Sequence, residues 1–210
     1  RQPWCHGAQP VPQAVLLNST ADHDRRIEKP FASARYESIQ GLTQLFLETQ
    51  QSLEIRAGHN LTGQMERWPL IAVPEVLSMD DSLRDELLRY ADKGGSLLLV
   101  GPGAVRPFAE ALGLAVRNED AVSYLSSDGD QWNVQVGANA VCAYPIGTQT
   151  VGRWAATRDD GAPSFPAAGI LRYGRGLVAC LPVDVGTGYR AGKTAAARAL
   201  FRALCARLYR

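Results

Sequence analysis

The sequence predicts an α/β fold, in which a mostly parallel β-sheet is covered by helices on both faces to give three layers. Several short apolar runs lack polar alternation, as strands buried on both faces do, and the segments between them have helical spacing. Residues 68–101, WPLIAVPEVLSMDDSLRDELLRYADKGGSLLLVG, show both features. With 210 residues, 46% of them hydrophobic, the chain is long enough to bury one substantial core.

The N-terminal part of the chain predicts two strands and one helix. Residues 1–12 contain three prolines and no periodicity, which is typical of a linker or an extended strap. Residues 14–17 are an apolar strand, and the polar stretch 18–30 is expected to be a long loop. Residues 32–49 have helical spacing. Residues 53–57 alternate between apolar and polar side chains, which predicts a strand at an edge of the sheet.

The central segment predicts a strand, a helix and a second strand. Residues 70–73 form a short apolar run, and Ser78 with Asp81 resembles a capping box at the start of a helix. The pair Gly94-Gly95 is expected to end that helix, and residues 97–100 return as another buried strand. A parallel return of this kind is right-handed in nearly every case.

Beyond the central segment the pattern changes. A short helix is expected at 105–114, and residues 115–165 are polar and rich in Gly, Asp and Ser. We interpret them as an irregular β-rich excursion at one edge of the sheet. Residues 168–183 predict a hairpin around the turn Gly174-Arg175-Gly176, and apolar spacing at 197–208 predicts a closing helix.

These elements predict one domain after an N-terminal strap. We expect the strap at 1–12 and a single α/β domain at 13–210. The formal net charge of +1 at pH 7 argues against nucleic acid or an anionic membrane surface as a partner. No apolar run approaches the roughly 20 residues of a membrane-spanning helix.

The cysteines indicate neither a disulfide framework nor a metal site. Cys5, Cys142, Cys180 and Cys205 are widely spaced and form no CxxC pair, so we interpret them as reduced thiols and expect no metal. Unpaired cysteines favour a cytoplasmic location, as does the lack of an apolar signal segment in residues 1–12.

Ligands of open α/β sheets bind beyond the carboxyl ends of the strands. The sequence places polar or glycine residues there, and these are the candidate ligand-binding residues: Asn18, Glu75, Gly101, Gly103 and Asp184. They do not form a set of nucleophile, base and orienting group, so no catalytic residue is assigned.

The turn Gly101-Pro102-Gly103 stands where an enzyme of this architecture carries its nucleophile, and it holds no Cys, Ser or Asp. It also lacks the spacing of a phosphate-binding loop, so no cofactor is expected. An unconventional nucleophile such as Cys142 would leave an amidotransferase-like hydrolase as one alternative.

The aromatic residues of the excursion allow a second alternative. Trp132 and Trp154, with Tyr124 and Tyr144, could stack on sugars and make the chain a carbohydrate- or small-molecule-binding module. Packing of these side chains onto the sheet or onto a neighbouring domain is the interpretation that we favour over stacking.

The βαβ unit, the stretch YGRGLVACLPVDVGTGY at 173–189 and the closing helix resemble a known family. It is the amidotransferase-like domain of multidomain glycoside hydrolases, called the trimerisation domain in trimeric β-galactosidases, with relatives in fucosidase-like glycosidases. The opening RQPWCHGAQPVPQAVLL resembles the strap between the catalytic barrel and this domain. The resemblance implies a flavodoxin-like, class I glutamine amidotransferase-like three-layer sandwich that has lost its cysteine nucleophile.

The resemblance also implies partners and a role. In the family, a preceding (β/α)8 barrel carries the two catalytic carboxylates, and this domain packs on the barrel or on an identical subunit. No catalytic residue of the family maps onto this chain, and the native protein is expected to continue beyond both ends. We therefore expect a non-catalytic accessory and assembly domain of a glycoside hydrolase.

Overall fold

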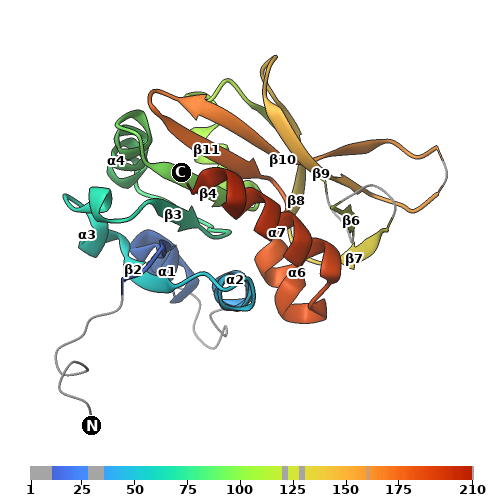
Figure 1. The fold of residues 1–210 in the computed structure, drawn as a ribbon, viewed down its shortest axis with the longest axis horizontal. Helices are drawn as coiled ribbons and strands as arrows, with labels where there is room; N and C mark the ends of the chain where they lie inside the picture. Colours follow the sequence, from blue (N-terminus) through green and yellow to red (C-terminus); the bar gives the residue numbers. More distant parts are fainter. Residues whose placement is uncertain (1–10, 28–35, 120–122, 128–130, 160, 210) are drawn as a thin grey trace, which may run out of the picture.

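The computed structural model of the protein describes residues 11–27, 36–119, 123–127, 131–159 and 161–209 (Figure 1). The strands of its parallel half are β1 (Ala14–Asn18), β2 (Leu53–Ala57), β3 (Leu70–Val73), β4 (Ser96–Val100) and β11 (Gly176–Leu181). Four further strands, β6 (Ser123–Ser126), β7 (Asn133–Gln135), β9 (Gln149–Ala155) and β10 (Ser164–Tyr173), extend the same sheet. Among the described residues the sheet order is β2-β1-β3-β4-β11-β10-β9-β6-β7.

The sheet has a parallel half and an antiparallel half. Strands β2, β1, β3, β4 and β11 are parallel to one another, and β11, β10, β9, β6 and β7 follow with antiparallel pairing. A separate two-stranded sheet joins β5 (Ala115–Glu119) to β8 (Asn139–Ala143). The predicted α/β fold with a mostly parallel core and a β-rich excursion at one edge is confirmed.

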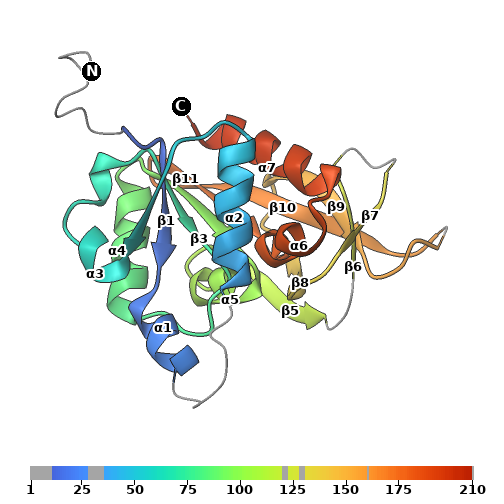
Figure 2. The ribbon, with the colours of Figure 1, turned by 90° about the horizontal axis from the view of Figure 1, so that it is seen from below.

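Helices cover both faces of the sheet (Figure 2). One face carries α2 (Glu37–Glu48), α6 (Val185–Gly192) and α7 (Ala195–Leu208), whereas the other carries α3 (Gly58–Leu61), α4 (Asp81–Asp92) and α5 (Pro102–Val105) with the 3-10 turns η2 (Met65–Arg67) and η3 (Arg106–Phe108). Helix α1 (Thr20–Ile27) lies beyond the end of β1. No helix in the described ranges is long and apolar enough to cross a membrane.

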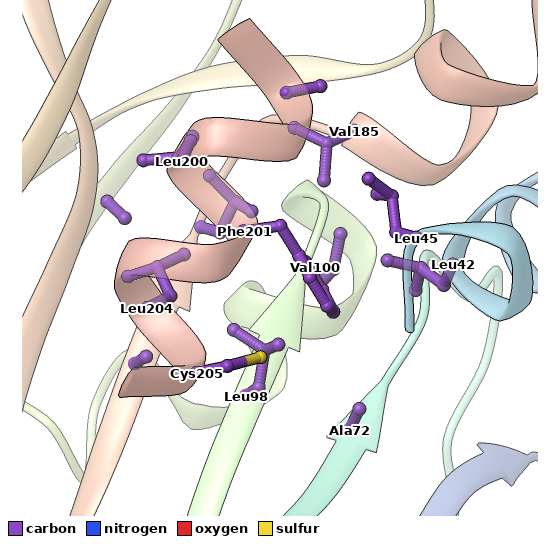
Figure 3. Packing of buried hydrophobic residues seen from close by; sticks show 14 of the residues in the cluster. Leu42, Leu45, Ala72, Leu98, Val100, Val185, Leu200, Phe201, Leu204 and Cys205 are labelled. Carbon is purple, nitrogen blue, oxygen red and sulfur yellow. The ribbon is translucent and has the colours of Figure 1, made fainter. Parts of the chain in front are cut away.

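The two faces hold two clusters of buried apolar side chains, because alternate residues of a strand point to opposite faces. In β1, Ala14 and Leu16 belong to the cluster under α2, α6 and α7, whereas Val15 and Leu17 belong to the cluster under α4 and α5. Figure 3 shows Phe201 of α7 and Val100 of β4 in the first cluster. The unalternating apolar runs of the sequence are therefore explained by burial on both sides.

Three expectations about helices are corrected by the structure. The stretch expected to be a loop at 18–30 contains α1, which has few apolar residues. Its start is held by a local cap, in which the Asp22 N–H donates to Ser19 Oγ (3.2 Å), and by a tertiary contact, in which Asp22 Oδ1 accepts from the Leu77 N–H (2.6 Å). Helix α4 begins directly after Asp80, whose side chain makes no capping hydrogen bond, rather than with a box starting at Ser78. The short helix expected at 105–114 is α5 and the turn η3, ending at residue 108.

Helix α6 was not expected, because the segment VGTGYRAG contains three glycines and glycine is a poor helix former. Packing against α2 explains them. A Cβ built on Gly41 of α2 would lie 1.8 Å from the carbonyl oxygen of Gly186 in α6. Glycine therefore permits two helices to approach backbone to backbone, and this tertiary contact outweighs local propensity.

Candidate functional site

The carboxyl ends of the parallel strands bring together residues that are distant in sequence. Since β1, β3, β4 and β11 are parallel neighbours, the residues that follow them lie along one edge of the sheet. Asn18 ends β1, and Glu75, Gly101 and Asp184 come shortly after β3, β4 and β11. This edge is where ligands of open α/β sheets bind.

The turn after β4 is closed by the side chain of Glu75. The Gly103 N–H donates to Glu75 Oε2 at 2.8 Å. Gly101 has a φ of 90°, a conformation that favours glycine, and a Cβ on it would lie 2.1 Å from Glu75 Oε2. A Cβ on Gly103 would lie 2.0 Å from the carbonyl oxygen of Val76 and 2.6 Å from Glu75 Oε1. The carboxyl group thus fills the space in which a side chain of this turn would stand.

A serine links Glu75 to a second buried carboxyl group. Ser38 Oγ of α2 donates to Asp184 Oδ1 at 2.7 Å and accepts from the Glu75 N–H at 3.2 Å. Asp184 also caps α6, since its carboxylate accepts from the Thr187 N–H (3.1 Å) and from Thr187 Oγ1 (2.5 Å). Ser38 was not a sequence candidate, because nothing in its helical context distinguishes it from other polar positions of α2.

Burial and like charge shift the protonation of this pair. Desolvation, and then the negative charge of Asp184, raise the pKa of Glu75 from 4.5 to about 7, although the Gly103 and Ala104 N–H groups and Arg106 oppose the shift. Burial also raises the pKa of Asp184, against the hydrogen bonds from Thr187 and Ser38. Glu75 is therefore an acid–base group that changes charge close to neutral pH.

A hollow of about 500 Å³ lies beside Glu75, a size typical of small-molecule sites. The loop after β3 contributes one wall, in which Leu77 is 60% exposed. Arg106 of η3 and Asn139 of β8 contribute polar groups to the lining. The full lining is Glu75, Val76, Leu77, Ser78, Met79, Pro102, Gly103, Arg106, Pro107, Ala138 and Asn139.

The sequence-predicted ligand residues divide into two groups. Glu75, Gly101, Gly103 and Asp184 meet around the turn after β4, and Asn18 lies at the same edge of the sheet at the end of β1. Trp154 belongs to β9 and Trp132 directly precedes β7, so both belong to the antiparallel half of the sheet.

The aromatic side chain of Trp154 is buried and is not available to stack on a sugar. Trp154 is 1% exposed and packs on Phe165, with ring centroids 5.3 Å apart. This agrees with packing, the interpretation favoured above, and the alternative of stacking on a sugar is wrong for Trp154. Trp132 is half-buried just before β7. Tyr144 donates to the carbonyl oxygen of Cys180 (3.1 Å). The Arg158 guanidinium lies over Tyr124, with its Cζ 4.6 Å from the centroid of the Tyr124 ring.

The described cysteines are buried and have the properties of structural thiols. Burial raises the pKa of Cys142 to about 11 and that of Cys205 to about 12, and it raises the pKa of Cys180 as well. A thiol needs a lowered pKa to act as a nucleophile near neutral pH, so Cys142 is not activated. Cys5 lies outside the described residues.

His23 and His59, the histidines within the described ranges, each bond a hydroxyl group. His23 Nδ1 lies 2.6 Å from Tyr36 Oη, and His59 Nδ1 lies 3.3 Å from Thr20 Oγ1, so each of these contacts is with a hydroxyl group and not with a cysteine. In the described part of the chain, no group of three or more His, Cys, Asp or Glu side chains could hold a metal ion.

Comparison with known proteins gives structural matches only. No protein-family model and no curated protein match the chain. α-L-Fucosidase isoenzyme 2 from Paenibacillus thiaminolyticus matches with a TM-score of 0.70 and 16% identity over 98% of this chain and 34% of that one. A GH42 β-galactosidase from G. stearothermophilus matches with a TM-score of 0.66 and 14% identity over 95% of this chain and 30% of that one.

A third match is of a different kind. A cytoplasmic protein from Salmonella typhimurium LT2 has a TM-score of 0.62 and 11% identity, and the match covers 94% of this chain and 100% of that protein. The present chain thus spans about a third of the length of the two glycoside hydrolases but matches the whole of the Salmonella protein. It has the α/β fold, with parallel core strands and an antiparallel extension, of the part of these glycoside hydrolases that it matches.

Proposed function

We propose that the chain is a non-catalytic accessory and assembly domain of a carbohydrate-active enzyme, which packs on a catalytic barrel or on a neighbouring subunit. Support comes from the proteins that share the fold. An α-L-fucosidase and a β-galactosidase act on different sugars, yet both include a part that matches nearly all of this chain. A part common to enzymes of different specificity fits a role in assembly better than a role in recognising one sugar.

The observation that carries the proposal is the closed turn after β4. Glu75 fills the space in which a nucleophile on this turn would stand, and the backbone clash at Gly103 allows no larger residue there. Among the described residues, the thiols that could replace such a nucleophile are buried and have raised pKa values. The turn at which an enzyme of this fold would carry its nucleophile is therefore blocked, which favours a role in packing against other domains over a role in catalysis.

An activity assay of the 210-residue chain tests the non-catalytic part of the proposal. We expect no saturable hydrolysis of aryl glycosides, aryl esters, simple amides or glutamine. Saturable hydrolysis that is lost in Cys142→Ser or Glu75→Gln, but kept in the surface variant Glu110→Gln, would overturn it.

The hollow beside Glu75 supports one second candidate, a module that binds a sugar or another small molecule. Its volume suits such a ligand, and the Salmonella protein has this fold as its whole chain. Calorimetry with mono- and oligosaccharides tests it. Binding that is abolished by Ala138→Trp, which would fill the hollow, and kept by Ala143→Trp on the exposed part of β8 would favour the module. If no saccharide in the panel gave a heat of binding, the binding-module candidate would be ruled out.

A further inference from the structure

Strand β2 forms one edge of the nine-stranded sheet. Within the described ranges it pairs only with β1, in register over all five of its residues (Figure 1). An edge strand leaves the backbone N–H and C=O groups of its outer side available to another strand, and such an edge invites pairing unless it is blunted. The opposite edge, β7, has only three residues, so β2 is the longer of the two edges.

The sequence of β2, LEIRA, carries two charged side chains, which can blunt an edge, but Glu54 and Arg56 have opposite signs. It contains no proline or glycine, and its register with β1 shows no bulge. Ile55, at its centre, is 47% exposed. Because side chains alternate along a strand, Ile55 shares a face with Leu53, and Glu54 and Arg56 share the opposite face, where they form an ion pair with each other.

The spacing of the two charges makes this edge complementary to itself. We propose that β2 pairs with β2 of a second copy of this chain, antiparallel and about a two-fold axis at Ile55. In that register Glu54 of each copy lies opposite Arg56 of the other, and the two Ile55 side chains meet on the other face. Opposite charges in directly facing positions stabilise a strand pair, and like charges destabilise it.

The charges also select one register. A shift that keeps the faces of the two sheets aligned moves the two-fold axis by one residue. It then places Glu54 opposite Glu54, or Arg56 opposite Arg56. A parallel pair through the same outer edges would turn one copy over and join opposite faces of the two sheets. Sliding one strand by a single residue against the other is excluded, because side chains that point to opposite faces of the sheet would then stand in facing positions. The antiparallel register centred on Ile55 is therefore the arrangement in which both charges find an opposite partner.

This inference deepens the assembly role proposed above and rests on it. It names a second copy as the partner and β2 as the contact, and the symmetric pairing is of the isologous kind that generates closed dimers. A five-residue strand pair is a small contact, so we expect a dimer that dissociates on dilution rather than a permanent one.

Light scattering of the 210-residue chain over a dilution series measures this dimer directly. Glu54→Lys and Arg56→Glu should each weaken dimerisation about ten-fold or more, because two attractive pairs become repulsive at once. The double variant Glu54→Lys/Arg56→Glu should restore it, since the swapped charges again face opposite ones. Glu66→Lys, which makes the same change in net charge at an exposed site away from β2, is the matched control and should leave the dimer intact.

Three results would overturn the pairing: a monomer up to about 1 mM, the range of the weakest specific complexes; single variants that dimerise like the parent chain; or a double variant that stays as weak as the single ones. None of them bears on the mass of the native polypeptide, so failure of the pairing is distinguishable from failure of the proposed function.

Discussion

The two halves of the sheet are built differently. In the parallel half, every residue of β3 and β4 is buried, because helices cover both faces. In the antiparallel half, β9 begins with exposed residues and is buried only at its end, and β7 has one buried residue. The difference teaches that the parallel half is covered along its whole length and fixes the positions of Glu75 and Asp184. The antiparallel half joins the core only in part, through β6, the middle of β10 and the end of β9.

The largest expected effect is on the buried cluster under α2, α6 and α7, compared with the exposed edge of the antiparallel half. Phe201→Ala removes a fully buried ring that packs edge-on against Phe46, with centroids 4.7 Å apart, and should lower the free energy of unfolding by about 4 kcal/mol. Val134→Ala, at the exposed edge strand β7, should change it by less than about 0.5 kcal/mol. Urea titration of both variants measures the contrast, and equal losses would mean that the buried cluster and this edge do not differ in this way.

The contact between α2 and α6 gives the next effect. Gly41→Ala places a methyl group 1.8 Å from the Gly186 carbonyl oxygen and should cost about 3 kcal/mol, because backbone cannot move aside easily. Gly147→Ala, in the antiparallel half, meets nothing within 4 Å and should cost only about 1 kcal/mol, for its positive φ. If thermal unfolding showed the same loss for both, the close helix approach would be refuted.

Stability should depend on pH through Glu75. Its pKa is raised from 4.5 to about 7 in the fold, so between these values the native state keeps a proton that the unfolded chain has released. The free energy of unfolding therefore falls as pH rises through this window, by up to about 3 kcal/mol. Denaturant titrations from pH 4.5 to 8 should show a shallower fall in Glu75→Gln and an unchanged fall in Glu110→Gln. An equal fall in the parent chain and in Glu75→Gln would contradict the burial of this carboxyl group.

The smallest expected effect is on the thiols. Cys142, Cys180 and Cys205 are buried, so all three should resist alkylation in the folded chain near neutral pH and react once it is unfolded. Peptide mapping by mass spectrometry after a short exposure to iodoacetamide resolves each site. Rapid modification of Cys142 alone would contradict its burial and favour the alternative in which Cys142 is the nucleophile of a hydrolase.

The parallel half was predictable because burial on both faces leaves a plain signal. The runs at 70–73 and 97–100 matched β3 and β4 closely, and the hairpin at 168–183 matched β10 and β11. Helices α1 and α6 were not predictable, since one has few apolar residues and the other three glycines. Helix α6 depends on its contact with α2, and α1 depends on the contact of Asp22 with Leu77 in addition to a local cap at Ser19.

The candidate site was predictable in its place but not in its detail. Strand ends pointed to Glu75, Gly101, Gly103 and Asp184, and the topology brings these residues to one edge. Ser38, which joins the two carboxyl groups, comes from α2 and is 146 residues from Asp184. Trp154 kept two interpretations, because a tryptophan in a polar segment gives no indication of whether it faces a ligand or the core; its burial agrees with packing, the favoured one.

The mass of the native polypeptide in its source cells tests the central claim most directly, by immunoblot with an antibody to this domain. An accessory domain that spans about a third of a larger enzyme predicts a band of about three times 22.7 kDa. A band close to 22.7 kDa would contradict the claim and move the ligand-binding module to first place.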